Sequence, residues 1–502
     1  MRKLPSTAVL SGFIAASLTL GNGVHRQAQA QDLTAGRIPF RTLPTALMRL
    51  DAIRALEDDG RAATLIDVSR AHGVQTRRFQ IFQDGLEVVG AQALAHFNSS
   101  GMALTHPNRR IEVASVPAFT PQTAAHLALE TAGSASSRDL RSAPALKILP
   151  DGKGSGHLIY WVTLSPSPQH EGRDILLDAK TGSLIADIGH RLEMTEPQPV
   201  INHVRTATSD CQIVHPDTGF PVTIALRVCP TAVLNDVATA EASESARRAS
   251  SNARAVIEYF SATHHRSSFD GKGSELVSLV HVGNRFANAF WDSDAKFMAY
   301  GDGDGEVLGD LTQSLDVAGH EMTHGVTSST SQLIYMDESG ALNEAFSDYF
   351  GVVIAARARQ GEPDWGIGKE VFKSDRREQG LRNLRYPETL SARFLNQDGA
   401  YEKRPYPSKV SEKFESYGPC DQRNDRCYVH INSMIPARAM VLITDGIGMS
   451  KAEKLMYLVL TQYMTPISQF SDFKTQTLAA CSATLNEADC LKVGEALTEV
   501  GF

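Results

Sequence analysis

The sequence predicts an α+β protein of several domains, with strands frequent in its first 200 residues and helices dominant toward its end. A chain of 502 residues is too long for one ordinary hydrophobic core and suits roughly two to four domains. Polar and apolar residues alternate over 78–83, and the turn signal Asp84-Gly85 follows, which indicates a β-hairpin. Over 243–264 the apolar residues recur at helical spacing instead.

Hydrophobic residues make up 42% of the chain and charged residues 21%, which is typical of a soluble globular protein. The formal net charge of -8 gives no indication of nucleic-acid binding, so no nucleic-acid partner is expected. No segment beyond the N-terminus is long and apolar enough to span a bilayer, and no membrane partner is expected.

The N-terminus has the pattern of a secretory signal peptide over 1–30. Met1-Arg2-Lys3 is basic, an apolar run follows, and Ala28-Gln29-Ala30 is a small-residue cleavage site. A membrane anchor is the alternative, but the apolar run is short for one. The protein is therefore expected to be secreted, to the medium or the periplasm.

All six Cys lie after position 210, and an even number in an exported chain favours disulfides. Sequence alone allows fifteen pairings. We expect the three that are local in sequence: Cys211–Cys229, Cys420–Cys427 and Cys481–Cys490. A Cys-rich zinc site is the alternative, but no CxxC spacing supports it.

Residues 31–200 contain no Cys and no recognisable catalytic pattern. Further strands are predicted at 86–89, 91–97, 157–164 and 174–188. An ordinary ligand-binding domain is one interpretation of this region. Residues 191–210 are polar, include two Pro and are interpreted as a linker. After the helix at 243–264, His264 and His265 are expected to be exposed to solvent.

The strongest chemical pattern is His320-Glu321-Met322-Thr323-His324. Two His four residues apart lie on one face of a helix, so both rings can reach one metal ion. Zinc suits two nitrogens and a carboxylate, with a fourth position left to water, and Glu321 can serve that water as general base. A surface helix with two solvated His is the alternative.

A second predicted helix supplies the remaining carboxylates. Glu344 and Asp348 are four residues apart and share a face. Glu344 can be the third zinc ligand, and Asp348 can accept the ring N–H of a ligand His and fix its tautomer. Nineteen residues separate His324 from Glu344.

This spacing resembles that of the thermolysin family of secreted zinc endopeptidases. Related aminopeptidases place their Glu one residue nearer, and the third His of metzincins is absent here. NAFW at 288–291, YGDGDG at 300–305 and NDRCYVHINS at 424–433 follow the family's order, and 78–97 and 178–182 resemble its propeptide modules.

The resemblance implies a two-lobed zincin catalytic domain with a β-rich N-terminal lobe, a helical C-terminal lobe and a zinc cleft between them, preceded by an α+β propeptide of two modules. The expected boundaries are 1–30 for the signal peptide, 31–120 and 121–200 for the propeptide modules, and 201–350 and 351–502 for the catalytic lobes.

The resemblance also implies roles for residues whose local sequence does not by itself indicate a function. His430 and Tyr335 would stabilise the oxyanion, with Asp425 orienting His430. The alternative for His430 is an ordinary core histidine. Arg382 would grip a substrate carbonyl, and its alternative is an ordinary surface arginine. Asn288 and Ala289 would form hydrogen bonds with the substrate backbone. An apolar pocket on the leaving-group side of the scissile bond would be lined by Leu311, Val317, Ile367, Val371 and Leu381.

The implied activity is a neutral endopeptidase with one zinc ion that cleaves peptides and proteins before bulky apolar residues. Its own propeptide would be an intramolecular inhibitor and chaperone, removed by autoprocessing, and the mature enzyme would be a monomer. A zinc aminopeptidase and an inactive secreted binding protein are the alternatives. The spacing of Glu344 opposes the first, and the retention of Glu321, Tyr335 and His430 opposes the second.

One feature of the family is expected to be missing. Thermolysin binds two calcium ions through a cluster of carboxylates, and the matching positions here are Asp316, Ala355, Asp364, Gly366 and Lys369. Two Asp cannot hold two such ions, and a Lys ammonium would repel them. The double calcium site is therefore predicted to be absent, with Lys369 paired to Asp316 or Asp364.

Overall fold

The computed structural model describes residues 61–193, 213–214, 221–222 and 243–502, except 100, 106–109, 114–115, 135, 152–153, 167–170, 275, 284, 374–377 and 379. The predicted signal peptide, Cys211 and Cys229 lie outside the described residues. Among the described residues, no helix is long and apolar enough to cross a membrane.

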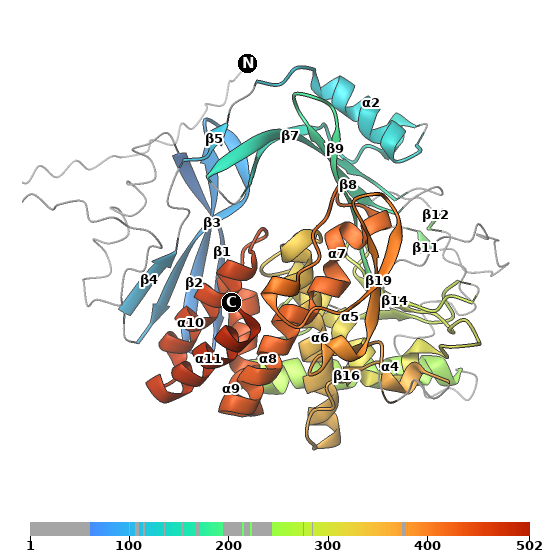
Figure 1. Cartoon of the computed structure of the whole chain (residues 1–502), viewed down its shortest axis with the longest axis vertical. Coiled ribbons are helices and arrows are strands. Elements are labelled where there is room, and N and C mark those ends of the chain that lie inside the picture. The colour runs from blue at the N-terminus through green and yellow to red at the C-terminus, as the bar shows by residue number, and fades with distance from the viewer. Residues whose placement is uncertain are drawn as a thin grey trace, which may run out of the picture. The chain divides into compact units, whose positions relative to one another are not determined.

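Nine strands near the N-terminus form one sheet, with the order β1-β2-β3-β6-β7-β8-β9, while β4 pairs with β3 and β5 with β7 (Figure 1). Their bounds are β1 (Arg61–Ala71), β2 (Val74–Gln83), β3 (Leu86–Asn98), β4 (Gly101–Thr105), β5 (Glu112–Val113), β6 (Ala145–Pro150), β7 (Ser155–Leu164), β8 (Arg173–Asp178) and β9 (Leu184–Gly189). The strands predicted from alternation are confirmed. The two strands expected at 86–89 and 91–97 are one strand that passes through Gly90, whose φ is 63°.

Helix α2 (Pro121–Thr131) packs on β7 and β8 and closes a small core of its own. Thr120 caps its N-terminus and Pro121 occupies its first turn, as expected for a helix start. The proposed boundary between the two N-terminal modules falls just before this helix. Across that boundary the strands meet through two short parallel pairings, β3 with β6 at Val88 and Ile148 and β5 with β7.

A second sheet has the order β10-β14-β15-β13, from β10 (Arg191–Glu193), β14 (Ala289–Asp292), β15 (Phe297–Tyr300) and β13 (Val277–Leu279). Strand β10 pairs antiparallel with β14, with Leu192 opposite Trp291. The interpretation of 191–210 as a linker is thus wrong for its first three residues, because Leu192 buries its side chain in the main core. Strands β11 (Ile213–Val214) and β12 (Pro221–Val222) form a separate pair.

Helices α5 (Leu315–Ser328) and α6 (Asp337–Arg359) are almost fully buried, and α4 (Glu244–His264) packs against them with its buried face. Ser243 caps α4, which confirms the predicted start. Helices α5 and α6 pass very close to each other, since a Cβ on Gly351 would lie 2.5 Å from the carbonyl oxygen of Asp316. Glycine at this crossing lets the two helices bring their polar side chains together in the core.

The C-terminal half is mainly helical and surrounds α6: α7 (Asp425–Asn432), α8 (Met434–Ile447), α9 (Met449–Leu458), the π-helical turn η8 (Val459–Tyr463), α10 (Phe470–Thr484) and α11 (Glu487–Val500). Two short hairpins, β16 (Gly366–Ile367) with β17 (Arg382–Asn383) and β18 (Ser391–Leu395) with β19 (Tyr401–Pro405), lie between α6 and α7. The predicted disulfides Cys420–Cys427 and Cys481–Cys490 are confirmed.

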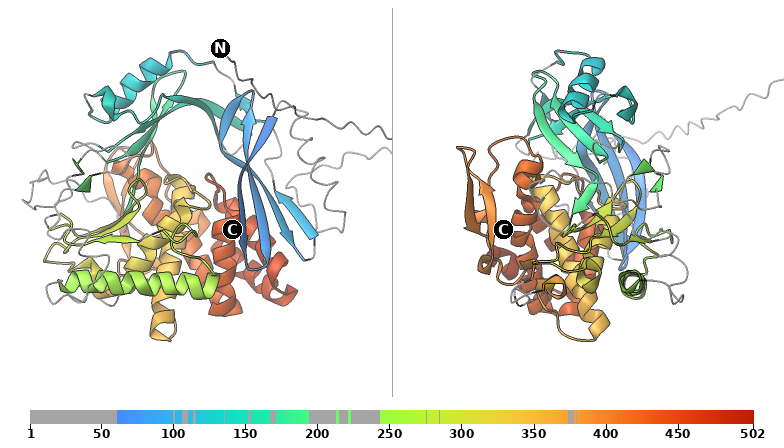
Figure 2. Two further views of the ribbon diagram at one scale, coloured as in Figure 1. Left: turned by 180° about the vertical axis from the view of Figure 1, so that it is seen from behind. Right: turned by 90° about the vertical axis from the view of Figure 1, so that its right-hand side faces the viewer.

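The first sheet docks on the C-terminal helices through buried polar groups, and the left view of Figure 2 shows its blue strands beside the red helices. Arg78 on β2 donates to the carbonyl of Met464 at 2.8 Å, just after η8. Thr76 donates to Gln462 at 2.6 Å, and the ring of His96 stacks on Tyr463 at 3.8 Å. The first sheet therefore contacts the widened turn of η8 and the residue that follows it.

A histidine pair completes this contact. His72, in the turn between β1 and β2, places Nε2 2.9 Å from Nδ1 of His264 at the end of α4. His264 also stacks on Tyr457 at 4.0 Å and is only 5% exposed. The expectation that His264 is exposed is wrong, because the docked sheet covers it, whereas His265 is exposed as expected.

Candidate metal centre

Three side chains converge between α5 and α6, and all three are fully buried: His320, His324 and Glu344. The Nε2 atoms of the two His lie 2.9 Å apart. Glu344 approaches them with Oε2 3.5 Å from His320 and Oε1 3.3 Å from His324. Their ligand atoms all lie within 4.8 Å of one another.

The hydrogen bonds on the far side of each ring indicate what this centre can hold. Nδ1 of His320 lies 2.8 Å from Asp348, and Nδ1 of His324 lies 2.9 Å from the side-chain oxygen of Asn343. Both partners are acceptors, so each neutral ring carries its proton on Nδ1 and turns a bare Nε2 inward. Burial lowers the pKa of His320 to about 4, which keeps it neutral. Two bare nitrogens facing a carboxylate fit a divalent cation, and zinc suits this donor set.

Asp348 also holds Arg382, and both are buried. The guanidinium donates from Nε to Oδ2 and from Nη2 to Oδ1, each at 2.7 Å. Arg382 and His320 lower the pKa of Asp348 against the opposing effect of burial, so it stays ionised. Sequence reasoning overlooked Asn343, whose only signal is its place directly before Glu344.

Glu321 follows His320 on α5 and is fully buried. Across the centre, the hydroxyl of Tyr335 donates to Glu344 and lies 3.2 Å from Nε2 of His430. Asp425 accepts from Nδ1 of His430 at 2.7 Å and from its backbone N–H at 2.9 Å. The centre therefore combines a carboxylate base on one side with two hydrogen-bond donors on the other.

A left-handed turn positions Asp425. The four consecutive residues from Asp425 to Tyr428 have φ between 50° and 70°, and none is glycine. Such a conformation costs about 1–2 kcal/mol per residue, so the surroundings must hold it. The side-chain oxygen of Asn424 accepts from the backbone N–H of Cys427 at 3.0 Å, and the disulfide ties Cys427 to Cys420.

The remaining candidates lie along β14 and in the core. Asn288 and Ala289 stand at the start of β14, next to the residues that pair with β10. The five residues expected to form an apolar pocket belong to the main hydrophobic core or pack on it: Leu311, Val317, Ile367, Val371 and Leu381.

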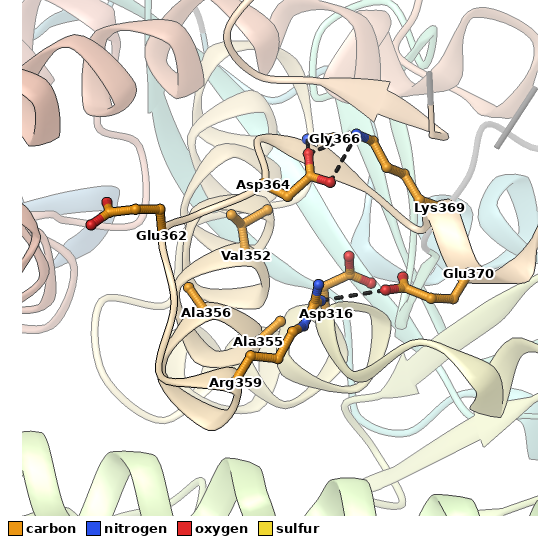
Figure 3. A pocket seen from close by; sticks show the side chains of 10 residues that line it. All are labelled: Asp316, Val352, Ala355, Ala356, Arg359, Glu362, Asp364, Gly366, Lys369 and Glu370. Atoms are coloured by element: carbon orange, nitrogen blue, oxygen red, sulfur yellow. Dashed lines mark hydrogen bonds and ion pairs between the residues drawn. The ribbon is translucent and has the colours of Figure 1, made fainter. Parts of the chain in front are cut away.

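Figure 3 shows the pocket that contains the positions considered for calcium: Asp316, Ala355, Asp364, Gly366 and Lys369. Lys369 Nζ lies 2.7 and 2.9 Å from the two carboxylate oxygens of Asp364, which confirms the expected pairing. Sequence reasoning missed Glu370, which accepts from Ser314 at 2.6 Å and faces Arg359 at 3.4 Å. The cavity among these side chains measures about 10 Å³, which is room for roughly one water molecule.

Comparison with known proteins gives consistent matches. Residues 226–328 match the family model "Thermolysin metallopeptidase, catalytic domain", and residues 331–502 match "Thermolysin metallopeptidase, alpha-helical domain". Bacillolysin from Bacillus subtilis (strain 168) is 31% identical over 377 residues, which are 71% of this chain and 67% of that protein. Neutral protease NprE from Bacillus pumilus is 37% identical over 247 residues, 49% of this chain and 73% of that protein.

Among solved structures, the precursor of protealysin, a metalloproteinase from Serratia proteamaculans, is 27% identical. The match covers 60% of this chain and 90% of that chain, with a TM-score of 0.48.

Proposed function

This chain belongs to the thermolysin family of metallopeptidases and is a zinc metalloendopeptidase; we propose that it is exported as a zymogen and cleaves proteins before bulky apolar residues. The main support is the convergence of two bare imidazole nitrogens and a carboxylate in a buried site. Since their outer nitrogens are fixed by Asp348 and Asn343, the rings are preorganised for a metal ion.

His320, His324 and Glu344 would hold the zinc ion. When bound, zinc polarises the scissile carbonyl and acidifies the attacking water. Glu321 takes the proton of that water and delivers it to the leaving nitrogen, so that the amine departs neutral. The hydroxyl of Tyr335 and Nε2 of His430 donate to the developing oxyanion.

Asp425 and Glu344 together raise the pKa of His430 to about 10, although burial opposes them. The ring is therefore protonated at neutral pH and has a proton on Nε2 to donate. Asp425 keeps that ring oriented, which makes it a positioning residue.

The substrate would lie extended along β14, bonded to the backbones of Asn288 and Ala289. Arg382, held by Asp348, would approach a substrate carbonyl on the leaving-group side. The five apolar residues named above would bind the side chain that follows the scissile bond. We further propose that residues 31–200 act as propeptide, inhibitor and chaperone, and that the mature enzyme is a monomer.

A peptide blocked at both ends, with leucine after an internal bond, tests this proposal. Wild-type enzyme should cleave it before the leucine, lose activity to a zinc chelator and regain it with added zinc. An aminopeptidase would spare the blocked peptide and cut one with a free amino terminus. A binding protein would cut neither.

A further inference from the structure

One buried cation beside the catalytic groups has no role in the mechanism. Arg426 follows Asp425 in the left-handed turn and is only 1% exposed. Its guanidinium carbon lies over the Tyr335 ring, 5.5 Å from the ring centre, within range of a cation–π contact. A charged side chain so close to an oxyanion donor is placed to touch substrate.

In the precursor this cation faces a carboxylate of the N-terminal region. Nη2 of Arg426 lies 3.4 Å from Oε1 of Glu171, and both side chains are more than nine-tenths buried. Arg426 also lowers the pKa of Asp187, a second carboxylate of that region, although burial raises it overall. Glu171 thus pairs directly with this cation, and Asp187, which pairs with Arg173, also feels its charge.

Gly189 gives independent support for a built contact. A Cβ at this position would lie 2.1 Å from Glu171 Oε1 and 2.4 Å from Arg426 Nη2. The ion pair therefore passes directly over the backbone where β9 ends, and a side chain at 189 would displace it.

The direction of the chain places this contact relative to the scissile bond. After Gly189 the chain enters β10, which runs antiparallel along β14 from Asp292 toward Phe290. That direction leads to Ala289 and Asn288, where the substrate backbone is proposed to bind. For a substrate that runs antiparallel to β14, as β10 does, Gly189 lies on the amino-terminal side of the bond to be cut.

We propose that Arg426 is a specificity-determining residue that selects an acidic side chain upstream of the scissile bond, and that Glu171 occupies this subsite in the precursor. This inference rests on the proposed endopeptidase function. A guanidinium and a carboxylate bind strongly where both are shielded from water. Release of the propeptide removes Glu171 and its cover, so a substrate carboxylate can take its place.

Quenched peptides with one cleavage site, carrying Glu or Gln at one of the second to sixth positions before the bond, test the proposal. For mature wild-type enzyme, Glu should raise kcat/KM about tenfold over Gln at one of these positions, mainly through KM. The ratio should fall near one for Arg426→Gln and stay above one for Arg426→Lys. High salt should reduce the wild-type ratio, a readout that remains if a variant fails to fold.

A wild-type ratio near one at every position would overturn the proposal, as would an unchanged ratio in Arg426→Gln. Hydrolysis of none of the peptides would instead count against the proposed function itself. In the full-length chain, Glu171→Gln should shorten the time to active enzyme, whereas the exposed Glu130→Gln on α2 should not. Equal times for both variants would overturn the assignment of Glu171.

Discussion

At the scale of single residues, the metal centre depends on the groups behind its ligands. Asp348 contacts both His320 and Arg382 within 2.8 Å, so it fixes the imidazole ring and the guanidinium together. We expect Asp348→Asn to weaken zinc binding about 10- to 100-fold, as measured by competition with a chelator. Asp445→Asn, at an exposed ion pair with Arg385, is the matched control and should bind zinc normally. Equal zinc affinity in both variants would contradict this role.

A substitution of Glu321 can distinguish catalysis from metal binding, because Glu321 lies beside the three proposed zinc ligands but is not one of them. Glu321→Ala should retain zinc but lose about a thousandfold in kcat. If maturation is autocatalytic, this variant should also accumulate as a precursor in a host without other proteases. Mass spectrometry of the purified protein measures both its zinc content and its length. Normal maturation of the variant would exclude autoprocessing.

The zinc-binding residues could be predicted because their spacing along two helices is fixed by helical geometry. Asn343 and Glu370 could not, since their partners lie on other elements and no local pattern marks them. His264 was misjudged for a similar reason: it packs on His72, 192 residues earlier, and on Phe350 and Tyr457 of later helices.

At the scale of elements, the left-handed turn before α7 is the least predictable feature of the site. Four non-glycine residues with positive φ contradict their own local preference, so only tertiary contacts and a disulfide explain the turn. By contrast, β2, β3, β7, β8, β9 and helix α4 follow their periodicity and were predicted, whereas β1, β4, β5 and β6 were not.

The turn leads to a prediction for the disulfides. Replacing Cys420 and Cys427 together by Ser should lower kcat about tenfold or more, because Asp425 would no longer hold His430. Replacing Cys481 and Cys490 should reduce thermal stability while leaving kcat nearly unchanged, since that disulfide joins α10 to α11. Steady-state kinetics with thermal unfolding separates the two effects. Full turnover without Cys420–Cys427 would refute the positioning role.

The contact between α6 and the β16–β17 hairpin carries the calcium prediction. Lys369 and Arg359 face Asp364 and Glu370 there, so cations of the chain itself offset the carboxylates. We expect calcium to change the rate of thermal inactivation of the mature enzyme equally little in wild type and in Asp364→Asn. Removal of zinc should still abolish activity. Two calcium ions between Asp316 and Asp364 in a crystal grown with calcium would contradict the prediction.

At the scale of the whole described chain, docking of the N-terminal sheet should depend on pH. His72 and His96 are docked as neutral rings, since burial lowers their pKa to about 4 and about 3. In the released propeptide both should titrate near 6.5. Docking is therefore strongest above pH 6.5 and weakens as pH falls toward 4, by about tenfold per histidine between pH 6.5 and 5.

Other charges at the contact modify this effect without reversing it. Lys454, His265 and Arg78 also disfavour protonation of these rings. His190 acts oppositely: Asp174 and Asp294 raise its pKa to about 10 despite burial. Protonated His190 stabilises the docked state fully below pH 6.5, and this stabilisation is lost as pH rises through 10. It therefore changes little between pH 6.5 and pH 4.

Dissociation of the cleaved propeptide from the mature enzyme, followed at pH 6.5 and pH 5, measures this dependence. The loss of affinity should shrink in His96→Gln and remain in the exposed His126→Gln. Equal affinity at the two pH values would contradict the prediction.

The same docked sheet has a mechanical consequence. The chain continues from this sheet into β10, which pairs with β14, while β2 and β3 contact η8, so the N-terminal region connects β14 to the C-terminal helices. A rigid segment that is bound to two parts of a protein restricts hinge motion between them. Hydrogen exchange in α6 and η8 should therefore be slower in the precursor than in the mature enzyme. The two catalytic lobes should gain their relative motion only after the propeptide has been released.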